Sequence, residues 1–172
     1  MKKVGLIDYY LDEWHANNYP RLLHDVSEGR YEAFCAYAKI DSEGSGLYDI
    51  YAIHQIEPIV RLMQTDAKRV MFLSDIDHPS MVIEFADGRL VQMQQVLELQ
   101  QQRGYEFSII TVDADNNAVE YPIRSRYFHN FMKGLIQFFD TGEIPVPHRD
   151  TVNVIAIRAA GMKAAEHPFT WV

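Results

Sequence analysis

The spacing of apolar residues divides the chain into stretches with different predicted structures. Short apolar runs at 3–8 (KVGLID) and 31–41 (YEAFCAYAKID) predict buried strands, and the stretch from Asn18 to about Ser27 predicts a helix between them. The start of the chain therefore predicts a strand–helix–strand unit. A dinucleotide-binding sheet has about six strands, and here the pattern stops after two.

A helical period begins after a loop-like segment. Residues 41–47 (DSEGSGL) carry two glycines and two serines, which is typical of a linker. We therefore expect one domain at 1–47 and a second at 48–172. From Tyr48 to about Met63 apolar residues recur at steps of three and four, which predicts an amphipathic helix. Pro58 should kink this helix or split it in two.

The period then changes to that of strands. Five segments are rich in β-branched and aromatic residues and separated by turn signals: 68–76, 80–86, 89–96, 105–113 and 118–123. Such spacing predicts an antiparallel meander, and Asp87-Gly88 suits a tight hairpin.

The last third of the chain returns to helix. A broad apolar face at 127–139 predicts one helix, ended by Gly142 as a left-handed cap. Asp150 or Thr151 can cap a final helix that ends before Pro168. The predicted fold class is α+β, with an open-faced, mostly antiparallel sheet backed by helices.

Two of the predicted strands are apolar on both faces. The alternating sets are Val70/Phe72 and Met71/Leu73 in one strand, and Met81/Ile83/Phe85 and Val82 in the other. An antiparallel sheet with one solvated face normally alternates cleanly. We therefore expect a homodimer packed through the open face of this sheet. Alternatively, residues 97–103 or the N-terminal segment cover it.

Charge and cysteine content exclude several classes of protein. A net charge of -8 argues against a protein that grips nucleic acid by its phosphates. Cys35 is the only cysteine, so no internal disulfide is possible, and its apolar strand favours an inert buried thiol. No run approaches the ~20 apolar residues of a membrane span, and the apolar run before Asp8 is too short for a signal peptide. We expect a cytoplasmic protein without a nucleic-acid or membrane partner.

Three segments resemble the Gfo/Idh/MocA oxidoreductases, relatives of glucose–fructose oxidoreductase and inositol dehydrogenase. They are KVGLIDYYLDEWHANNYP, YAIHQIEPIVRLM and FMKGLIQFFDTGEIPVPHRDTVNVIAIRAAGMKAA. The resemblance implies an N-terminal Rossmann domain that binds NAD or NADP, here reduced to a truncated Rossmann-like strand–helix–strand. It also implies a C-terminal domain that binds a sugar or polyol-like substrate and often forms a dimer interface.

The same resemblance implies a catalytic role for His54. A histidine in the first helix of the second domain often transfers the proton of the substrate hydroxyl, and Glu57 matches an acidic residue found three positions later. Asp49 lies five residues before His54, whereas the family commonly has an Asp four residues before. A pKa near ~6.5 lets histidine exchange protons at neutral pH. The alternative is a hydrogen-bonded histidine on a buried helix.

The chain departs from the family pattern where the cofactor would bind. The loop at 9–17 (YYLDEWHAN) lacks glycine and carries Asp12 and Glu13 where phosphate charges would lie. Asp41 could hold a ribose hydroxyl, or it caps a turn. The Glu-Lys-Pro motif of the family is absent. The resemblance implies NAD or NADP as the cofactor, and the alternative is that this truncated chain binds none.

Two functions from different classes follow. The first is an NAD(P)-dependent oxidoreductase acting on a sugar or polyol-like hydroxyl. The second is a non-catalytic dimerising or ligand-binding module derived from that family. A metal site formed by Asp8, Asp12, Glu13 and His15 is a weaker idea, because closely spaced acidic residues are usually just solvated. We expect no metal.

Overall fold

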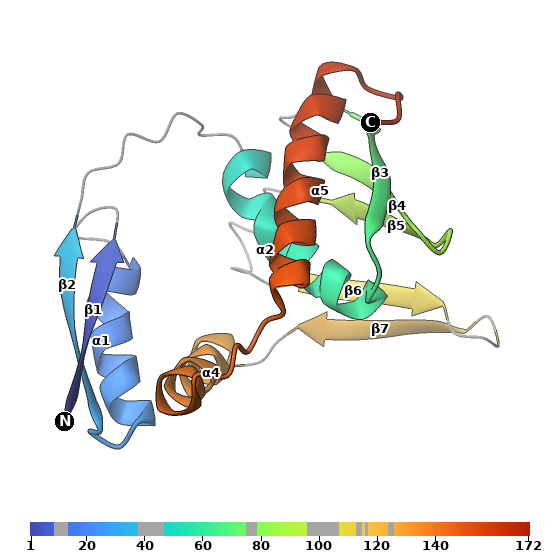
Figure 1. Ribbon diagram of the computed structural model, residues 1–172. Coiled ribbons are helices and arrows are strands. Elements are labelled where there is room, and N and C mark those ends of the chain that lie inside the picture. The colour runs from blue at the N-terminus through green and yellow to red at the C-terminus, as the bar shows by residue number, and fades with distance from the viewer. Residues whose placement is uncertain are drawn as a thin grey trace. The chain divides into compact units, whose positions relative to one another are not determined.

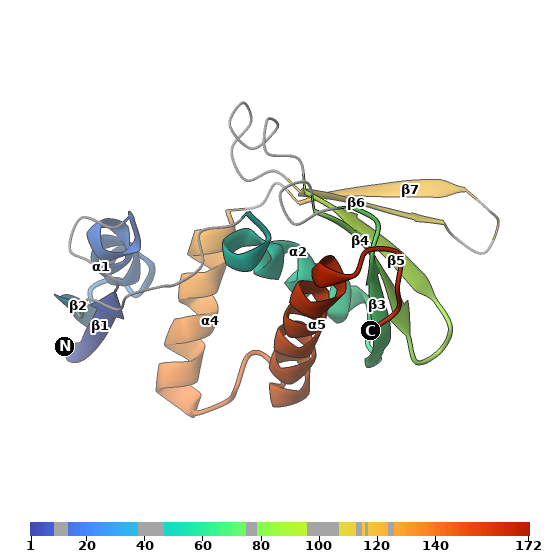
Figure 2. The same cartoon turned by 90° about the horizontal axis from the view of Figure 1, so that it is seen from above.

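A computed structural model describes residues 1–8, 14–37, 47–74, 79–95, 107–112, 115, 117–123 and 126–172. Within them the fold is α+β, as predicted (Figures 1 and 2). A small parallel β–α–β sheet comes first, and an open antiparallel sheet packed against helices follows.

The chain divides into two compact units. One consists of Met1–Ser42 and Arg124–Pro145, and the other of Glu43–Ile123 and Val146–Val172. The first unit therefore differs from the predicted domain 1–47, because it also takes up a helix from the last third of the chain.

The first unit begins with the predicted strand–helix–strand. Strands β1 (Lys2–Asp8) and β2 (Tyr31–Tyr37) are parallel, and α1 (Trp14–Val26) connects them. Helix α1 begins four residues before the predicted Asn18, whose side-chain Nδ2 donates to the Trp14 carbonyl at 2.7 Å. This contact supports the first turn of the helix.

Helix α4 (Tyr127–Thr141) completes the first unit. Its buried Met132 and Ile136 form one core with Leu23 and Tyr31 of the β–α–β segment. The predicted left-handed cap is confirmed. Gly142 has φ 77° and donates its N–H to the Phe138 carbonyl at 2.8 Å.

The second unit contains the antiparallel sheet. Its strands are β3 (Ala67–Phe72), β4 (Ser80–Phe85) and β5 (Leu90–Gln94), ordered β3-β4-β5. Gly88 has φ +87° in the hairpin between β4 and β5, as the Asp87-Gly88 pair predicts. Strands β6 (Phe107–Val112) and β7 (Ala118–Ile123) pair with each other in a separate ladder, so the five strands do not form one meander among the described residues.

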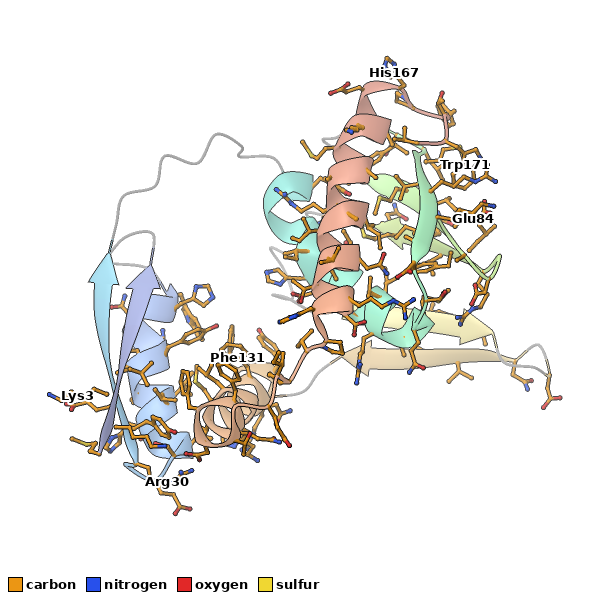
Figure 3. All side chains as sticks on the ribbon, viewed as in Figure 1. Lys3, Arg30, Glu84, Phe131, His167 and Trp171 are labelled. Carbon is orange, nitrogen blue, oxygen red and sulfur yellow. The ribbon has the colours of Figure 1, made fainter. Side chains whose placement is uncertain are left out.

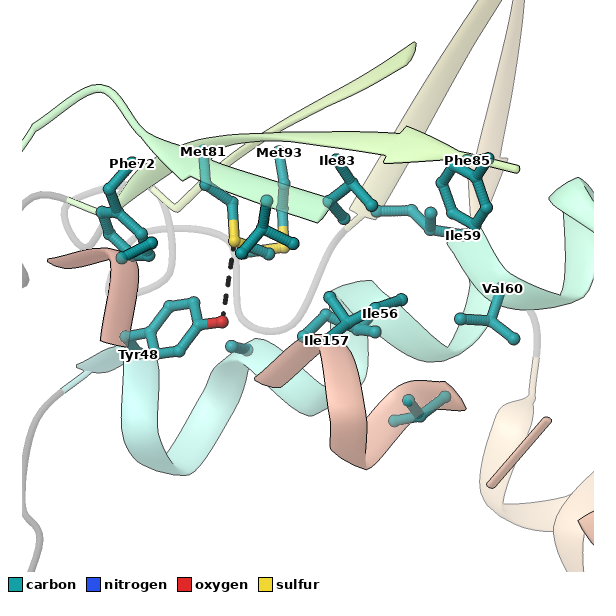
Figure 4. Packing of buried hydrophobic residues seen from close by; sticks show 14 residues of the cluster. Tyr48, Ile56, Ile59, Val60, Phe72, Met81, Ile83, Phe85, Met93 and Ile157 are labelled. Atoms are coloured by element: carbon teal, nitrogen blue, oxygen red, sulfur yellow. Dashed lines mark hydrogen bonds between the residues drawn. The ribbon is translucent and has the colours of Figure 1, made fainter. Parts of the chain in front are cut away.

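Helices α2 (Leu47–Met63) and α5 (His148–Glu166) cover one face of the β3–β5 sheet (Figures 2 and 4). The core between them is apolar, and its largest members are Tyr48, Ile56, Phe72, Met81, Ile83, Phe85 and Ile157. Of the two outcomes predicted at Pro58, the split is wrong, because α2 is one helix from Leu47 to Met63. The kink stays a prediction. Packing of Ile56, Ile59 and Val60 on either side of the proline offsets the lost helical hydrogen bond.

The predicted caps of the last helix are also wrong. Helix α5 begins at His148, with Pro147 before it at φ -56° and ψ 136°. Asp150 therefore lies in the first turn, where its charge suits the helix dipole, and its backbone N–H donates to the Pro147 carbonyl at 3.0 Å. The helix ends at Glu166, before Pro168, as predicted.

A close contact fixes α2 against α5. The buried Tyr48 hydroxyl lies 3.6 Å from Met81 Sδ (the dashed line in Figure 4) and donates to the Arg158 carbonyl at 3.2 Å. Burial raises the pKa of Tyr48 well above its ordinary value, so the hydroxyl keeps its proton. A Cβ at Gly161 would lie 1.8 Å from the Tyr48 oxygen. Only glycine leaves room for the ring at this position.

The residues after α5 return to the edge of the sheet. Val70 and Val172 exchange two backbone hydrogen bonds of 2.9 Å, and the Phe169 N–H donates to the Phe72 carbonyl at 2.7 Å. Phe169 adopts φ 64°, a left-handed conformation that bends the chain back after the helix. The tail therefore covers one edge of β3.

Replacing Gly161 by alanine should destabilise the second unit. The added methyl group would overlap Tyr48, and overpacking of this kind typically costs about 1–3 kcal/mol. Urea unfolding followed by circular dichroism measures the loss. Gly134→Ala in α4 is the matched control, since its nearest neighbour is 3.9 Å away. That variant should be neutral or gain about 0.5–1 kcal/mol from helix propensity. Equal stability of both variants would contradict the tight Tyr48 fit.

Candidate functional site

Helix α2 presents His54 on its exposed face. Ala52, Ile56 and Val60 lie in the core, whereas His54 and Glu57 are exposed. Residues three apart share one face of a helix, so these two side chains lie on the same side of α2. The structure thus places His54 at the surface and not on the buried face of the helix. A diffusing ligand can reach a side chain in this position.

Gln55 follows His54 in α2, and its side chain reaches the end of β5. Gln55 Nε2 donates to the Gln94 carbonyl at 2.9 Å. The next residue, Gln95, donates its backbone N–H to the Pro79 carbonyl at 2.9 Å, so it continues the β4–β5 pairing. The side-chain oxygens of Gln55 and Gln95 are buried and accept no hydrogen bond among the described residues.

Several predicted site residues lie outside the described residues. These are Asp41, expected at the ribose, and residues 9–13, expected to form the phosphate loop. Asp49 and Cys35 lie in α2 and β2 by their backbone. The roles predicted for these positions therefore stay predictions.

Aromatic rings gather where α1 and α4 begin. Trp14 and Phe128 have ring centroids 4.3 Å apart, and Tyr19 packs against Phe131 at 5.7 Å. Trp14 remains 47% exposed and Phe131, labelled in Figure 3, 50% exposed. Helix α1 is the element that comes after β1 in the chain, so its first turn and the cluster lie toward the carboxyl ends of the parallel strands, where α/β sheets bind ligands.

The most strongly perturbed carboxylate of the described residues is Asp140, near the end of α4. It accepts hydrogen bonds from Arg30 Nη1 at 2.7 Å, the Tyr31 hydroxyl at 2.7 Å and Lys2 Nζ at 3.2 Å. The Arg30 guanidinium, then Tyr31 and Lys2, hold the pKa of Asp140 well below its usual range. Lys2 and Tyr31 begin β1 and β2. The cluster therefore lies at the amino ends of the strands, and we assign it a structural role.

The outer face of the β3–β5 sheet is less apolar than the sequence suggests. Glu84 (Figure 3) pairs with Lys68 at 2.8 Å and with Arg69 at 2.5 Å, and both partners hold its pKa below the usual range. The Arg69 guanidinium lies 4.3 Å from the centre of the Trp171 ring. Met71 and Val82 are half-buried on this face. Paired charges and the C-terminal tryptophan thus cover part of the expected apolar patch.

The described part of the chain lacks two features that mark other functional classes. No group of three or more His, Cys, Asp and Glu side chains there could hold a metal ion. No helix there combines the length and apolar character needed to cross a membrane.

No protein-family model, curated protein or solved structure matches the chain. The resemblance to the Gfo/Idh/MocA oxidoreductases therefore depends on the three sequence segments alone.

Sequence reasoning missed the Gln55–Gln95 pair. Helical periodicity places Gln55 beside the buried Ile56, and strand alternation places Gln95 on the same face as the buried Met93. Those two signals indicate inward-facing amides. Their burial depends on how α2 packs against the sheet, which no local pattern reveals.

The Asp140 cluster should make the first unit sensitive to acid. The pKa of Asp140 is lower in the folded state than in the unfolded chain, where it is about 4. The ionised carboxylate therefore stabilises the fold above the unfolded pKa, and this contribution is lost as pH falls toward the folded pKa. Hydrogen exchange of β1 and β2 amides should speed up between pH 5 and pH 3, after correction for intrinsic rates, by more than about 2-fold.

Asp140→Asn should raise exchange at pH 7 and flatten this pH dependence. Asp66→Asn is the control, because Asp66 pairs with Arg149 on the surface of the other unit. An Asp140→Asn protein with unchanged protection at pH 7 would show that the cluster contributes nothing to the fold.

Proposed function

We propose that this chain is the substrate-side part of an NAD(P)-dependent oxidoreductase of the Gfo/Idh/MocA type, joined to an abbreviated nucleotide-binding unit. Its substrate is a sugar or polyol-like hydroxyl compound. The observation that carries the proposal is the combination of a parallel β1-α1-β2 crossover with a helix-backed antiparallel sheet whose first helix exposes His54. This is the order of elements that the sequence resemblance implies.

The first crossover fits only part of a dinucleotide site. Strands β1 and β2 provide one edge of a ligand crevice, and the described residues contain no further parallel strand to build the opposite side. Asp12 and Glu13 also place negative charge in the loop that follows β1. The proposal therefore assigns to this chain the binding and proton-transfer side of the reaction.

His54 has the chemistry for that role. Oxidation of a secondary alcohol removes a hydride from carbon and a proton from the hydroxyl, and a bound nicotinamide is the acceptor of the hydride. The imidazole of His54 accepts the hydroxyl proton and passes it to solvent, which its exposure on α2 permits. Glu57, on the same face, can orient the imidazole or stabilise its protonated form.

A second candidate is a non-catalytic dimerising module. It is favoured by the two-stranded parallel sheet, which is small for a cofactor domain, and by the half-buried Met71 and Val82 on the outer face of the other sheet. In this reading a second copy covers that face. A homodimer is also compatible with the oxidoreductase proposal, so cofactor binding has to separate the two.

Titration with NADH should quench tryptophan fluorescence and saturate below millimolar cofactor. Trp14 begins α1, which follows β1, and α/β sheets bind ligands at the carboxyl ends of their strands, so a nicotinamide bound there should quench this residue. Trp171→Phe removes the tryptophan of the other unit and should keep the signal, whereas Trp14→Phe should lose it.

His54→Asn should bind NADH normally and lose more than about 100-fold in sugar or polyol oxidation. No saturation at millimolar NADH would leave only the dimerising module.

The dimer should depend on the outer sheet face. Val82→Glu places a charge opposite Met71 in the β3–β4 register, so light scattering after gel filtration should show the mass fall from two chains to one. Val152→Glu is the control, since Val152 is 68% exposed on α5. A wild-type mass of one chain at about 100 μM, or a Val82→Glu dimer, would exclude this interface.

A further inference from the structure

The tail, residues 167–172, lies along the edge of β3 that faces away from β4. Val70 and Val172 exchange two backbone hydrogen bonds of 2.9 Å, which is the pattern of an antiparallel strand pair. The Phe169 N–H donates to the Phe72 carbonyl at 2.7 Å. The tail therefore binds β3 through main-chain groups, and main-chain pairing of this kind places little demand on the sequence of the added segment.

One side chain of the tail adds a specific contact. The Arg69 guanidinium lies 4.3 Å from the centre of the half-buried Trp171 ring, within the range of a cation–π interaction. Arg69 also forms an ion pair with Glu84, which is labelled with Trp171 in Figure 3. Glu84 belongs to β4 and not to the tail, so it orients the guanidinium whether or not the tail is bound. The edge of β3 thus carries a preformed position for an aromatic side chain.

The tail reaches this edge with a strained backbone. Phe169 has φ 64°, in the left-handed region that bulky residues rarely adopt. Its side chain is 72% exposed, so burial of the ring offsets little of the cost. A separate peptide needs no such bend, because it does not continue from α5. The tail therefore holds its place by the high local concentration that attachment to α5 provides, and not by an optimal fit.

We propose that the edge of β3 is a binding site for an extended peptide of another protein, and that the tail occupies this site in cis as an autoinhibitory segment. The peptide pairs antiparallel with β3 and places an aromatic side chain over Arg69, as Trp171 does. It replaces the tail, so the sheet gains no strand. The proposal does not depend on the oxidoreductase function, because it uses no residue assigned to proton transfer or to the cofactor.

A second copy of the chain is a poorer occupant of this edge. Its own tail would leave one β3 edge only to enter an identical one, so the exchange forms no additional contact. A foreign segment with a more favourable aromatic contact and no bend does gain free energy over the tail. This difference favours a peptide partner.

The site requires that the tail can leave while the sheet stays folded. In the wild-type chain, the amides of Val70 and Val172 bond across the edge, and their hydrogen exchange should be about tenfold faster than that of the β4 amides, after correction for intrinsic rates. Equal exchange of the two sets would show that the tail opens only when the whole sheet unfolds. That result would overturn the proposal.

Relief of the strain should hold the tail more firmly. Phe169→Asn introduces a residue that tolerates the left-handed region, so exchange of the Val172 amide should slow by about twofold or more. Gln64→Asn is the matched control, because Gln64 has φ 54° in the turn after α2 and should leave this amide unchanged. An unchanged rate in Phe169→Asn would contradict the strained tail and overturn its autoinhibitory role.

The binding test uses the peptide HPFTWV, the sequence of the tail, with fluorescein at its amino end. Fluorescence anisotropy measures its binding to the full chain. Trp171→Ala weakens the tail and leaves β3 and Arg69 unchanged, so this variant should bind the peptide about threefold or more tightly than the wild type does. Thr170→Ala, at the exposed neighbouring residue, is the matched control and should bind like the wild type.

The contribution of the aromatic position is measured with a second peptide. HPFTAV should bind the Trp171→Ala protein about threefold or more weakly than HPFTWV does, because it lacks the ring that lies over Arg69. No saturation of this variant at about 1 mM HPFTWV, or equal affinity of the variant and the wild type, would overturn the proposal. Light scattering without peptide tests the other occupant. A larger mass for Trp171→Ala than for wild type and Thr170→Ala would assign the edge to a second copy and overturn the peptide assignment.

Discussion

The second unit depends on how Tyr48 fits against Gly161. The tyrosine ring at the start of α2 occupies the space that any side chain on Gly161 of α5 would need, and its hydroxyl reaches the Arg158 carbonyl. This contact sets how closely the two helices approach each other above the sheet. It thereby fixes the rotation of α2, which turns Ile56 inward and His54 outward. Both the exposed imidazole and the buried Gln55 amide follow from that rotation.

Local patterns were sufficient for much of the fold. In β4, Met81, Ile83 and Phe85 are buried and the residues between them are half-buried. The alternation is visible in the sequence and predicts a strand. The Asp87-Gly88 hairpin and the Gly142 cap also depend on single residues with left-handed backbone angles. Such features need no knowledge of the rest of the chain.

Contacts between distant segments could not be predicted in this way. The apolar face of α4 was recognised, but not its packing against Leu23 and Tyr31, which lie about a hundred residues earlier. The continuity of α2 through Pro58 has the same origin, because the tertiary core supplies the stability that the missing N–H removes. The Asp140 cluster joins Lys2, Arg30 and Tyr31 across a similar distance. For the candidate site, the sequence predicted a role for His54, which the structure places on the exposed face of α2, and it missed the buried oxygens of Gln55 and Gln95.

The pairing of the C-terminal residues with β3 restricts how the sheet can associate. Val172 and Phe169 form hydrogen bonds with backbone groups of Val70 and Phe72. In an uncovered edge strand, those groups would be available to pair with another chain. An occupied strand cannot act as a template for intermolecular β-pairing, which is a common start of aggregation. Two copies of this protein therefore cannot associate by adding a strand to the sheet at β3. Any association there has to use side-chain contacts.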